Sequence, residues 1–263
     1  MNKNTRKVKN NSKRKVRKSF LFVMFVFIIA LLVILSTTVF FPISSVTLKY
    51  GGELYSEQQI LKLADIKIGE NLIMLPKNKI SKRVTKNLTY IGELKIEKEF
   101  PDKVVLTAKE TSAMYCIKSN KKYYVLDKNF KVLEEIKKAN KKLIGINGIK
   151  LVNNEVGEYA EVEKTDHYES FKTIVKYVND GGDKLNYINF TKSGEIEFFV
   201  NGKFKVQLGT VSELDDKLAF MSKMIDEITK KNKKDEGRIN LTYFPSKKEG
   251  YFTRETVEIN YFS

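Results

Sequence analysis

An apolar segment over residues 20–41 dominates the hydrophobic pattern of the chain, and it contains no charged residue. As an α-helix with a rise of about 1.5 Å per residue it would be roughly 33 Å long, which matches the ~30 Å hydrocarbon core of a bilayer. It is longer than the apolar core of a cleavable signal peptide, and no small-residue cleavage site follows it. Pro42 would end the helix. The segment therefore predicts one retained transmembrane helix.

The next pattern, over residues 42–112, contains five segments of strand or helix period. Ser56 stands three residues before Gln59, which is a capping box that begins a helix. The apolar positions that set the periods are Val46, Leu48 and Tyr50; Ile60, Leu63 and Ala64; Ile80, Val84, Leu88 and Ile91; Leu94, Ile96 and Phe100; and Val104, Leu106 and Ala108. Their spacing predicts the order strand, helix, helix, strand, strand.

Residues 113–263 carry a second set of strands and helices. Asn201-Gly202 lies between two alternating apolar runs and predicts a β-hairpin. Capping pairs, Asp166 with Glu169 and Ser212 with Asp215, predict the starts of two helices. Further strands are predicted at 114–117, at 123–126, at 239–243 and, last, through Val257, Ile259 and Tyr261. This half is expected to be a mostly antiparallel sheet with packed helices, which makes the chain α+β.

The formal net charge of +16 is concentrated in a short N-terminal tail. Residues 1–18 hold nine of the 48 Lys and Arg residues and no acidic residue, which leaves 39 basic against 32 acidic residues. A basic tail before an apolar helix places the N-terminus in the cytoplasm and the bulk outside the membrane. A patch for anionic lipid or nucleic acid is the alternative for this tail. The predicted parts are a tail at 1–19, a transmembrane helix at 20–41, and domains at 42–112 and 113–263.

Few residues of the chain suit catalysis or metal binding. Cys116 is the only cysteine and His167 the only histidine, which excludes an internal disulfide and a Cys/His metal cluster. These two could form a nucleophile and its base, and Asp215-Asp216 or Glu134-Glu135 could be paired acids. Their positions favour a strand, helix caps and solvated surface instead. No nucleotide-binding or metalloprotease motif is present. We expect no enzyme activity, cofactor, metal, nucleic acid or small-molecule substrate.

Aromatic and β-branched residues concentrate near the C-terminus. A strand at the end of a chain easily lies at a sheet edge, where another chain can add a strand of its own. The predicted partner-binding residues are Tyr243, Phe252, Val257, Ile259 and Tyr261. The alternative is that these side chains fill the core of the second domain.

Several short motifs stand in the order and spacing of a known family. In the first domain they are Gly51-Gly52, Ile68-Gly69-Glu70-Asn71-Leu72, Phe100-Pro101, and Val104-Val105-Leu106 with Glu110. In the second they are Tyr124-Val125-Leu126-Asp127, Leu208-Gly209 with Lys217-Leu218, and Ile239-Asn240-Leu241-Thr242-Tyr243. With these motifs, the basic tail and the apolar segment, the chain resembles the FtsQ/DivIB family of bacterial cell-division proteins. It departs from the family at Asn240 and Thr242, where the family usually has Asp and Arg.

The resemblance implies an FtsQ-type POTRA domain of β-α-α-β-β order, followed by the family's β domain. It also implies a single-pass scaffold of the divisome, in the cytoplasmic membrane at the division septum, that helps to couple septal wall synthesis to constriction. The implied partners are other bitopic division proteins of the FtsB/DivIC and FtsL types, bound by strand addition. Two alternatives stay open. One is a membrane-anchored envelope enzyme or ligand-binding protein with paired acids across a cleft, and the other is a POTRA-type export chaperone.

Overall fold

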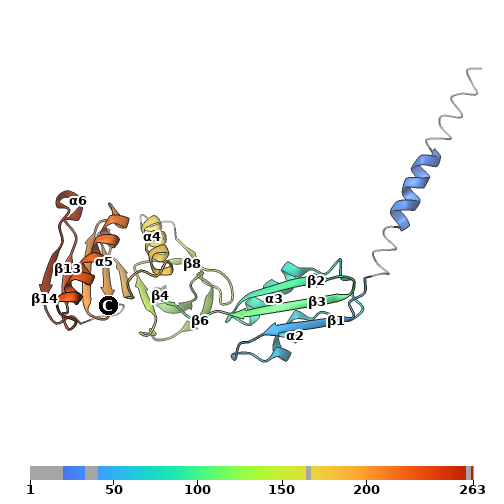
Figure 1. The fold of residues 1–263 in the computed structure, drawn as a ribbon, viewed down its shortest axis with the longest axis horizontal. Helices are drawn as coiled ribbons and strands as arrows, with labels where there is room; N and C mark the ends of the chain where they lie inside the picture. The colour runs from blue at the N-terminus through green and yellow to red at the C-terminus, as the bar shows by residue number, and fades with distance from the viewer. Residues whose placement is uncertain (1–19, 33–40, 164–166, 259–261, 263) are drawn as a thin grey trace, which may run out of the picture. The chain divides into compact units, whose positions relative to one another are not determined.

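The computed structural model describes residues 20–32, 41–163, 167–258 and 262 (Figure 1). Residues 20–32 form an α-helix whose apolar side chains are exposed. Among the described residues, no helix has both the length and the hydropathy needed to cross a membrane. The predicted basic tail at 1–19, and residues 33–40 of the predicted span, lie outside the described part of the chain.

The described residues form two compact units. Unit 1 contains the described residues up to Arg83 together with Leu94–Ala108. Unit 2 contains Val84–Glu93 and the described residues from Lys109 onward. The domain limits expected from the sequence, at residues 112 and 113, stay a prediction.

Unit 1 is built on a three-stranded sheet and two helices. Its elements are β1 (Ser45–Tyr50), α2 (Glu57–Ala64), α3 (Lys77–Asn87), β2 (Ile91–Glu99) and β3 (Lys103–Glu110), of which the last three continue into unit 2. The sheet has the order β1-β3-β2, and β1 runs parallel to β3. This is the order of strands and helices that the sequence predicts.

A capping box begins α2, the first helix of the sheet domain in unit 1. Ser56 Oγ accepts a hydrogen bond from the Gln59 N–H at 3.2 Å, and Gln59 Oε1 accepts one from the Ser56 N–H at 2.8 Å. The predicted capping box is therefore confirmed. The helix that it begins contributes Ile60 and Ala64 to the buried apolar residues of unit 1, which also include Ile43, Leu72, Leu75, Ile80, Leu94, Ile96, Val104, Val105, Leu106 and Ala108.

Unit 2 is organised around a nine-stranded mixed sheet of order β14-β13-β12-β11-β10-β7-β4-β5-β6. Its strands are β4 (Tyr115–Ser119), β5 (Lys122–Leu126), β6 (Val132–Ile136), β7 (Ile144–Asn147), β10 (Leu185–Phe190), β11 (Ile196–Val200), β12 (Phe204–Gly209), β13 (Gly237–Asn240) and β14 (Tyr251–Arg254). A separate pair consists of β8 (Leu151–Asn153) and β9 (Glu161–Val162), and the helices are α4 (Tyr168–Asn179), α5 (Leu214–Lys231) and α6 (Phe244–Lys247). Five pairings in the large sheet are antiparallel and three are parallel. The predicted α+β class is confirmed.

The two faces of the large sheet carry different clusters. On β11, Phe198 packs in the cluster of one face and Phe199 in that of the other, as the alternation of a strand requires. Helices α4 and α5 cover the first face, where Ile174 and Met221 are completely buried (Figure 1). The second face has a smaller cluster of Cys116, Tyr187, Phe199 and Phe262. We call this second face the helix-free face.

The predicted N-cap of α5, Ser212, is wrong. The N-cap is Glu213, in the left-handed conformation with φ 52°, and no side chain caps the helix. The Ser212 hydroxyl instead bonds the Thr210 hydroxyl at 3.0 Å, because the chain turns sharply before the helix begins. In the other predicted capping pair, Asp166 lies outside the described residues.

Candidate functional site: the open edge of the large sheet

Strand β14 forms one edge of the nine-stranded sheet. It pairs antiparallel with β13, so that Phe252 stands opposite Ile239 and Thr253 opposite Arg238. In the described part of the chain, no strand lies on its other side. Such an edge presents a row of backbone donors and acceptors to which another chain can add a strand.

The hydrogen bonds of β14 show which of its backbone groups point outward. The Glu255 N–H donates to the Glu236 carbonyl at 3.4 Å, which makes these two residues a hydrogen-bonded pair. Such pairs alternate with non-hydrogen-bonded pairs along antiparallel strands, so Thr253 also bonds to β13. The N–H and C=O groups of Phe252 and Arg254 therefore point to the open edge.

Aromatic side chains lie beside this edge. Tyr243 is 58% exposed and Tyr251 is 49% exposed. Phe252 is half-buried, and its ring centroid lies 6.2 Å from that of Phe204 on β12, in the core under the helices. Of the residues predicted to bind a partner, Tyr243 thus presents its ring to solvent, whereas Phe252 packs into the core that supports the edge.

The last strand of the described residues, β14, ends at Arg254, before the strand that the sequence predicts through Val257, Ile259 and Tyr261. Val257 lies outside any strand and packs, half-buried, against the cluster of the helix-free face. Phe262 is buried in the same cluster, and its N–H donates to the Tyr187 hydroxyl at 3.0 Å. Ile259 and Tyr261 lie outside the described residues.

Ion pairs hold β14 against β13. The Arg254 guanidinium contacts the Asp235 carboxylate at 2.7 Å, and Asp235 is only 7% exposed. Arg238, on β13, pairs with Glu255 at 2.9 Å. These contacts link β14 and the residue after it to β13 and to the turn before β13.

The opposite edge of the sheet, β6, is covered where it begins. The Val132 N–H donates to the Glu158 carbonyl at 2.9 Å, and the Gly157 N–H donates to the Val132 carbonyl at 2.8 Å. A loop therefore occupies the place that an added strand would take beside Val132. Edge β14 is the better candidate for partner binding.

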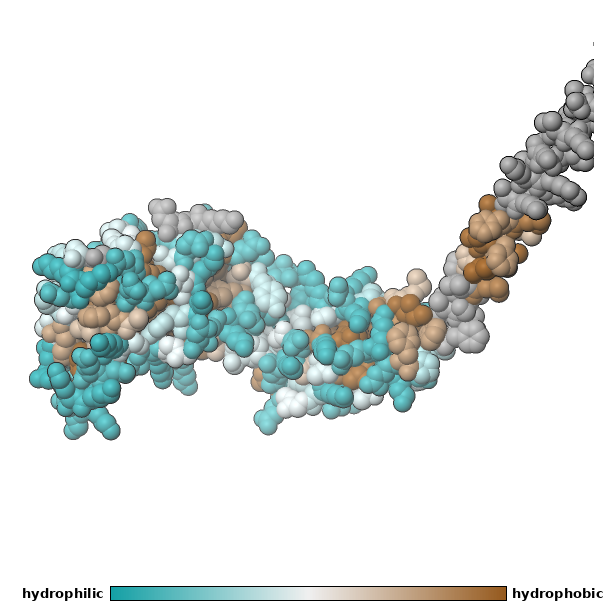
Figure 2. All heavy atoms as spheres, turned by 45° about the horizontal axis from the view of Figure 1, so that its top comes forward, coloured by the Kyte–Doolittle hydropathy of each residue, from teal (hydrophilic) through white to brown (hydrophobic). Residues whose placement is uncertain are grey.

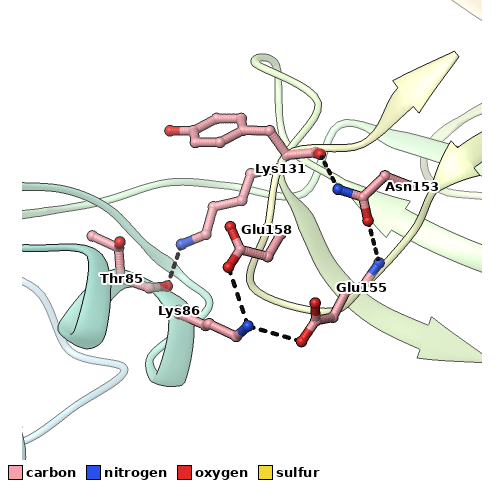
Figure 3. Close-up of polar contacts among 7 residues, drawn as sticks. Thr85, Lys86, Lys131, Asn153, Glu155 and Glu158 are labelled. Carbon is pink, nitrogen blue, oxygen red and sulfur yellow. Dashed lines mark hydrogen bonds and ion pairs between the residues drawn. The ribbon is translucent and has the colours of Figure 1, made fainter. Parts of the chain in front are cut away.

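A buried lysine fastens Val84–Glu93 to the rest of unit 2 (Figure 3). Lys131 is 1% exposed, and its Nζ donates to the carbonyls of Thr85 at 2.6 Å, Thr89 at 2.8 Å and Ile91 at 2.8 Å. These carbonyls lie in the last turn of α3 and just beyond it, where unpaired acceptors and the helix dipole favour a cation. Lys131 thus serves as a cap for this end of the helix.

The protonation of the two lysines in this network differs. Burial lowers the pKa of Lys131 to about 8, against the opposing effect of the Asp127 and Glu158 carboxylates. At neutral pH the ammonium group therefore keeps its proton and its three bonds. Lys86 pairs with Glu155 at 2.8 Å and with Glu158 at 3.1 Å, and the hydrogen bond that its Nζ donates to Glu155 is the main reason that its pKa is raised.

Sequence reasoning did not single out Lys131. A lysine just after the Asp127 turn has the pattern of a solvated surface residue. The only sequence signal for its burial is its place between two apolar residues, Phe130 and Val132.

The candidate nucleophile and base lie on opposite faces of the large sheet. Cys116 is buried in the cluster of the helix-free face, and burial raises the pKa of its thiol. The His167 ring lies 5.3 Å from the Phe190 ring, whose cluster belongs to the face under the helices. The sheet itself separates the two groups, so they do not form a catalytic pair.

The candidate paired acids have structural roles. A groove of about 480 Å3 at the starts of α4 and α5 has the acidic lining residues Glu169, Glu213, Asp215 and Asp216. Carboxylates in the first turn of a helix stabilise its positive end, which accounts for most of this lining. Glu169 pairs with Lys172 at 2.9 Å, and on β6 Glu135 pairs with Lys122 at 2.8 Å.

Comparisons with known proteins agree with the resemblance seen in the sequence. Residues 41–110 match the family model described as POTRA domain, FtsQ-type. Over 250 residues, which cover 90% of this chain and 92% of the relative, the sequence is 28% identical to cell division protein DivIB of Clostridium botulinum strain Hall. The chain is thus similar to the FtsQ/DivIB family of cell-division proteins over most of its length. DivIB of Clostridium tetani is 27% identical over 78% of this chain and 77% of its own.

More distant members of the family match shorter parts of the chain. DivIB of Bacillus subtilis is 27% identical over 129 residues, which are 48% of either chain. The solved extracytoplasmic domain of DivIB from Geobacillus stearothermophilus is 15% identical and aligns with 47% of this chain and 98% of its own. Its TM-score of 0.27 is too low for a comparison of folds. The similarity to FtsQ/DivIB proteins rests on the sequence relatives and the POTRA match.

Proposed function

We propose that this FtsQ/DivIB protein is a non-enzymatic, bitopic scaffold of the divisome, whose extracytoplasmic domains bind other division proteins. In this role it helps to couple septal wall synthesis to constriction. The observation that carries the proposal is the open edge β14, in a chain related to DivIB over nearly its whole length. The lack of a paired nucleophile and base among the described residues is consistent with it.

The proposed scaffold is anchored by one membrane span over residues 20–41, with its N-terminus in the cytoplasm and its bulk outside, at the division septum. The span is supported by a segment without charge that follows nine basic residues. The described helix at 20–32 exposes apolar side chains all along its surface, which lipid would cover. The proposed domains are the POTRA domain at 42–112 and the β domain at 113–263.

The proposed mode of binding is the addition of a partner strand to β14. Phe252 and Arg254 supply the outward backbone groups, and the exposed ring of Tyr243 supplies apolar contact beside them. The partners that this mode suits are bitopic division proteins of the FtsB/DivIC and FtsL types. Ile259 and Tyr261, which the sequence also assigns to partner binding, remain part of the proposal.

Two substitutions at position 254 isolate the contribution of the backbone N–H to partner binding. Arg254→Pro removes an outward N–H and keeps φ in the range that an edge strand tolerates, whereas Arg254→Ala keeps the N–H. Both variants lose the same ion pair with Asp235. Since a strand-pairing hydrogen bond contributes about 0.5–1.5 kcal/mol and the proline ring also obstructs its neighbours, we expect Arg254→Pro to weaken partner binding about tenfold relative to Arg254→Ala.

The measurement is co-purification of the full chain with FtsB/DivIC-like and FtsL-like proteins from membranes, at matched protein levels. Partner capture by Arg254→Ala and its loss in Arg254→Pro would support strand addition. Equal capture by both variants would show that the edge is not used. Binding of many unfolded exported proteins, instead of one or two partners, would favour an export chaperone.

A further inference from the structure

The end of unit 1 at which the chain enters is built by two segments that bond to residues 41–44. The Leu72 N–H donates to the Phe41 carbonyl at 2.8 Å, and the Gly69 N–H donates to the Ile43 carbonyl at 2.8 Å. The Ser44 N–H donates to the Asp102 carbonyl at 2.8 Å. The loop before α3 and the turn between β2 and β3 therefore meet where the apolar segment of residues 20–41 ends.

Large apolar side chains project from this end into solvent. Their exposed fractions are 76% for Met74, 64% for Ile68, 62% for Phe100 and 40% for Ile73. The Phe100 ring packs edge-on against the Phe41 ring, with 5.6 Å between the centroids. Figure 2 shows side chains of high hydropathy gathered on unit 1 where β1 begins. Single exposed apolar residues are ordinary on a protein surface, but a cluster of four indicates a surface that binds a partner or a membrane.

These side chains sit on ordered backbone. The Met74 N–H donates to the Asn71 Oδ1 at 3.1 Å, and Lys98 Nζ donates to the Ile73 carbonyl at 2.7 Å. The loop is thus fixed on both sides of its apolar residues. The exposure of Ile73 and Met74 is a property of the fold and not of a loose loop.

We infer that Ile68, Ile73, Met74 and Phe100 form a membrane-contact surface, by which unit 1 lies against the outer face of the bilayer that its own anchor crosses. The inference rests on the proposed span. If residues 20–41 cross the membrane, Phe41 is the last residue of the span, and its hydrogen bond to Leu72 brings the loop to the bilayer surface. Apolar side chains at that depth are removed from water by the lipid interface.

The charges around this surface indicate which lipids it needs. Exposed Lys67 and Lys103 lie beside the apolar side chains, and so do exposed Glu70 and Glu99. Lys98 also lies here, with its Nζ on the Ile73 carbonyl. Because groups of both signs surround the apolar side chains, contact does not require anionic headgroups. The occupant is the bilayer interface itself, and zwitterionic lipid suffices.

The absence of tryptophan from the chain allows a direct test. Single tryptophans replace Met74 and Phe100 in the full chain, reconstituted in phosphatidylcholine vesicles that contain lipid brominated near the headgroup. Leu54→Trp is the matched control, because Leu54 is 58% exposed in the same unit but follows the far end of β1. Phe27→Trp reports on the span itself, with lipid brominated deep in the acyl chain.

We expect blue-shifted emission, and its quenching by headgroup-proximal bromine, at positions 74 and 100 but not at 54. If position 27 is quenched by deep bromine while positions 74 and 100 behave like 54, the membrane-contact surface is refuted and the span stands. If position 27 is not quenched by any brominated lipid, the proposed anchor fails, and the membrane-contact surface fails with it.

Discussion

Replacing Lys131 by Met should change how the stability of the protein depends on pH. In the folded protein, burial lowers the pKa of Lys131 to about 8, against the ordinary lysine value of 10.5. Between these values the folded lysine is neutral and the unfolded lysine is charged, so unfolding takes up a proton. Raising the pH opposes that uptake, and the free energy of unfolding should therefore increase through this window.

The size of the effect follows from the two pKa values. A difference of about 2.5, at 1.36 kcal/mol for each pKa unit, corresponds to about 3 kcal/mol between pH 8 and pH 10.5. Below pH 8 lysine is charged in both states, so the contribution no longer changes with pH. The Lys131→Met variant lacks the titration, and it also loses the three hydrogen bonds from Nζ to the carbonyls of Thr85, Thr89 and Ile91, at about 1 kcal/mol each.

The assay is urea unfolding of the full chain in a mild detergent, followed by circular dichroism from neutral pH to pH 10.5. The measured quantity is the difference in free energy of unfolding between the unchanged protein and Lys131→Met, which we expect to widen as the pH rises. Lys172→Met is the control, because Lys172 is exposed and its hydrogen bond to Glu169 raises its pKa. Its contribution is lost only above the ordinary lysine value of 10.5, so the difference for Lys172→Met should not widen in this window. A difference for Lys131→Met that stays constant across the window would refute this account of the buried lysine.

Two further predictions concern the backbone. Gly157→Ala should destabilise the protein at least about 2 kcal/mol more than Gly194→Ala. Both positions have positive φ, 89° and 86°. A Cβ at Gly157 would lie 2.2 Å from the Lys86 carbonyl oxygen, whereas nothing lies within 4 Å of a Cβ at Gly194. Equal losses in thermal unfolding would contradict the close approach. Ser56→Ala should lower the stability of α2 by about 1 kcal/mol through loss of the capping box, and Ser56→Asp should restore most of that stability. Hydrogen exchange of the α2 amides measures the change. Unchanged exchange in Ser56→Ala would show that the helix does not need the cap.

The features predicted correctly from the sequence are those that neighbouring residues determine. The capping box at Ser56 needs only Gln59, three residues away. The turn at Asn201-Gly202 is likewise local, since both residues adopt positive φ, 54° and 68°, between β11 and β12. A few neighbouring residues determine such elements, and the fold of the remaining chain does not change them.

The features missed depend on residues far apart in the chain. Strand β7 has only four residues and lies parallel to both of its neighbours, β4 and β10, so its sequence shows no alternation. Lys131 is explained only by carbonyls about forty residues earlier. The burial of Phe262 on the helix-free face is also a tertiary effect, since its cluster partners Cys116, Tyr187 and Phe199 are far away in the chain. The edge was predicted as a class of site, and Phe252 on β14 was among the predicted residues, but Arg254 was not.

The most direct test of the scaffold proposal is photo-crosslinking in dividing cells. A photoreactive amino acid replaces Tyr251, which lies on β14, or Ser193, which is exposed in the turn between β10 and β11. We predict crosslinks from position 251 to a small bitopic division protein of the FtsB/DivIC type, in cells whose labelled chain forms a ring at mid-cell, and none from position 193. Absence of crosslinks at 251 in cells with such rings would contradict partner binding at this edge, and labelling spread evenly over the envelope would contradict the septal scaffold.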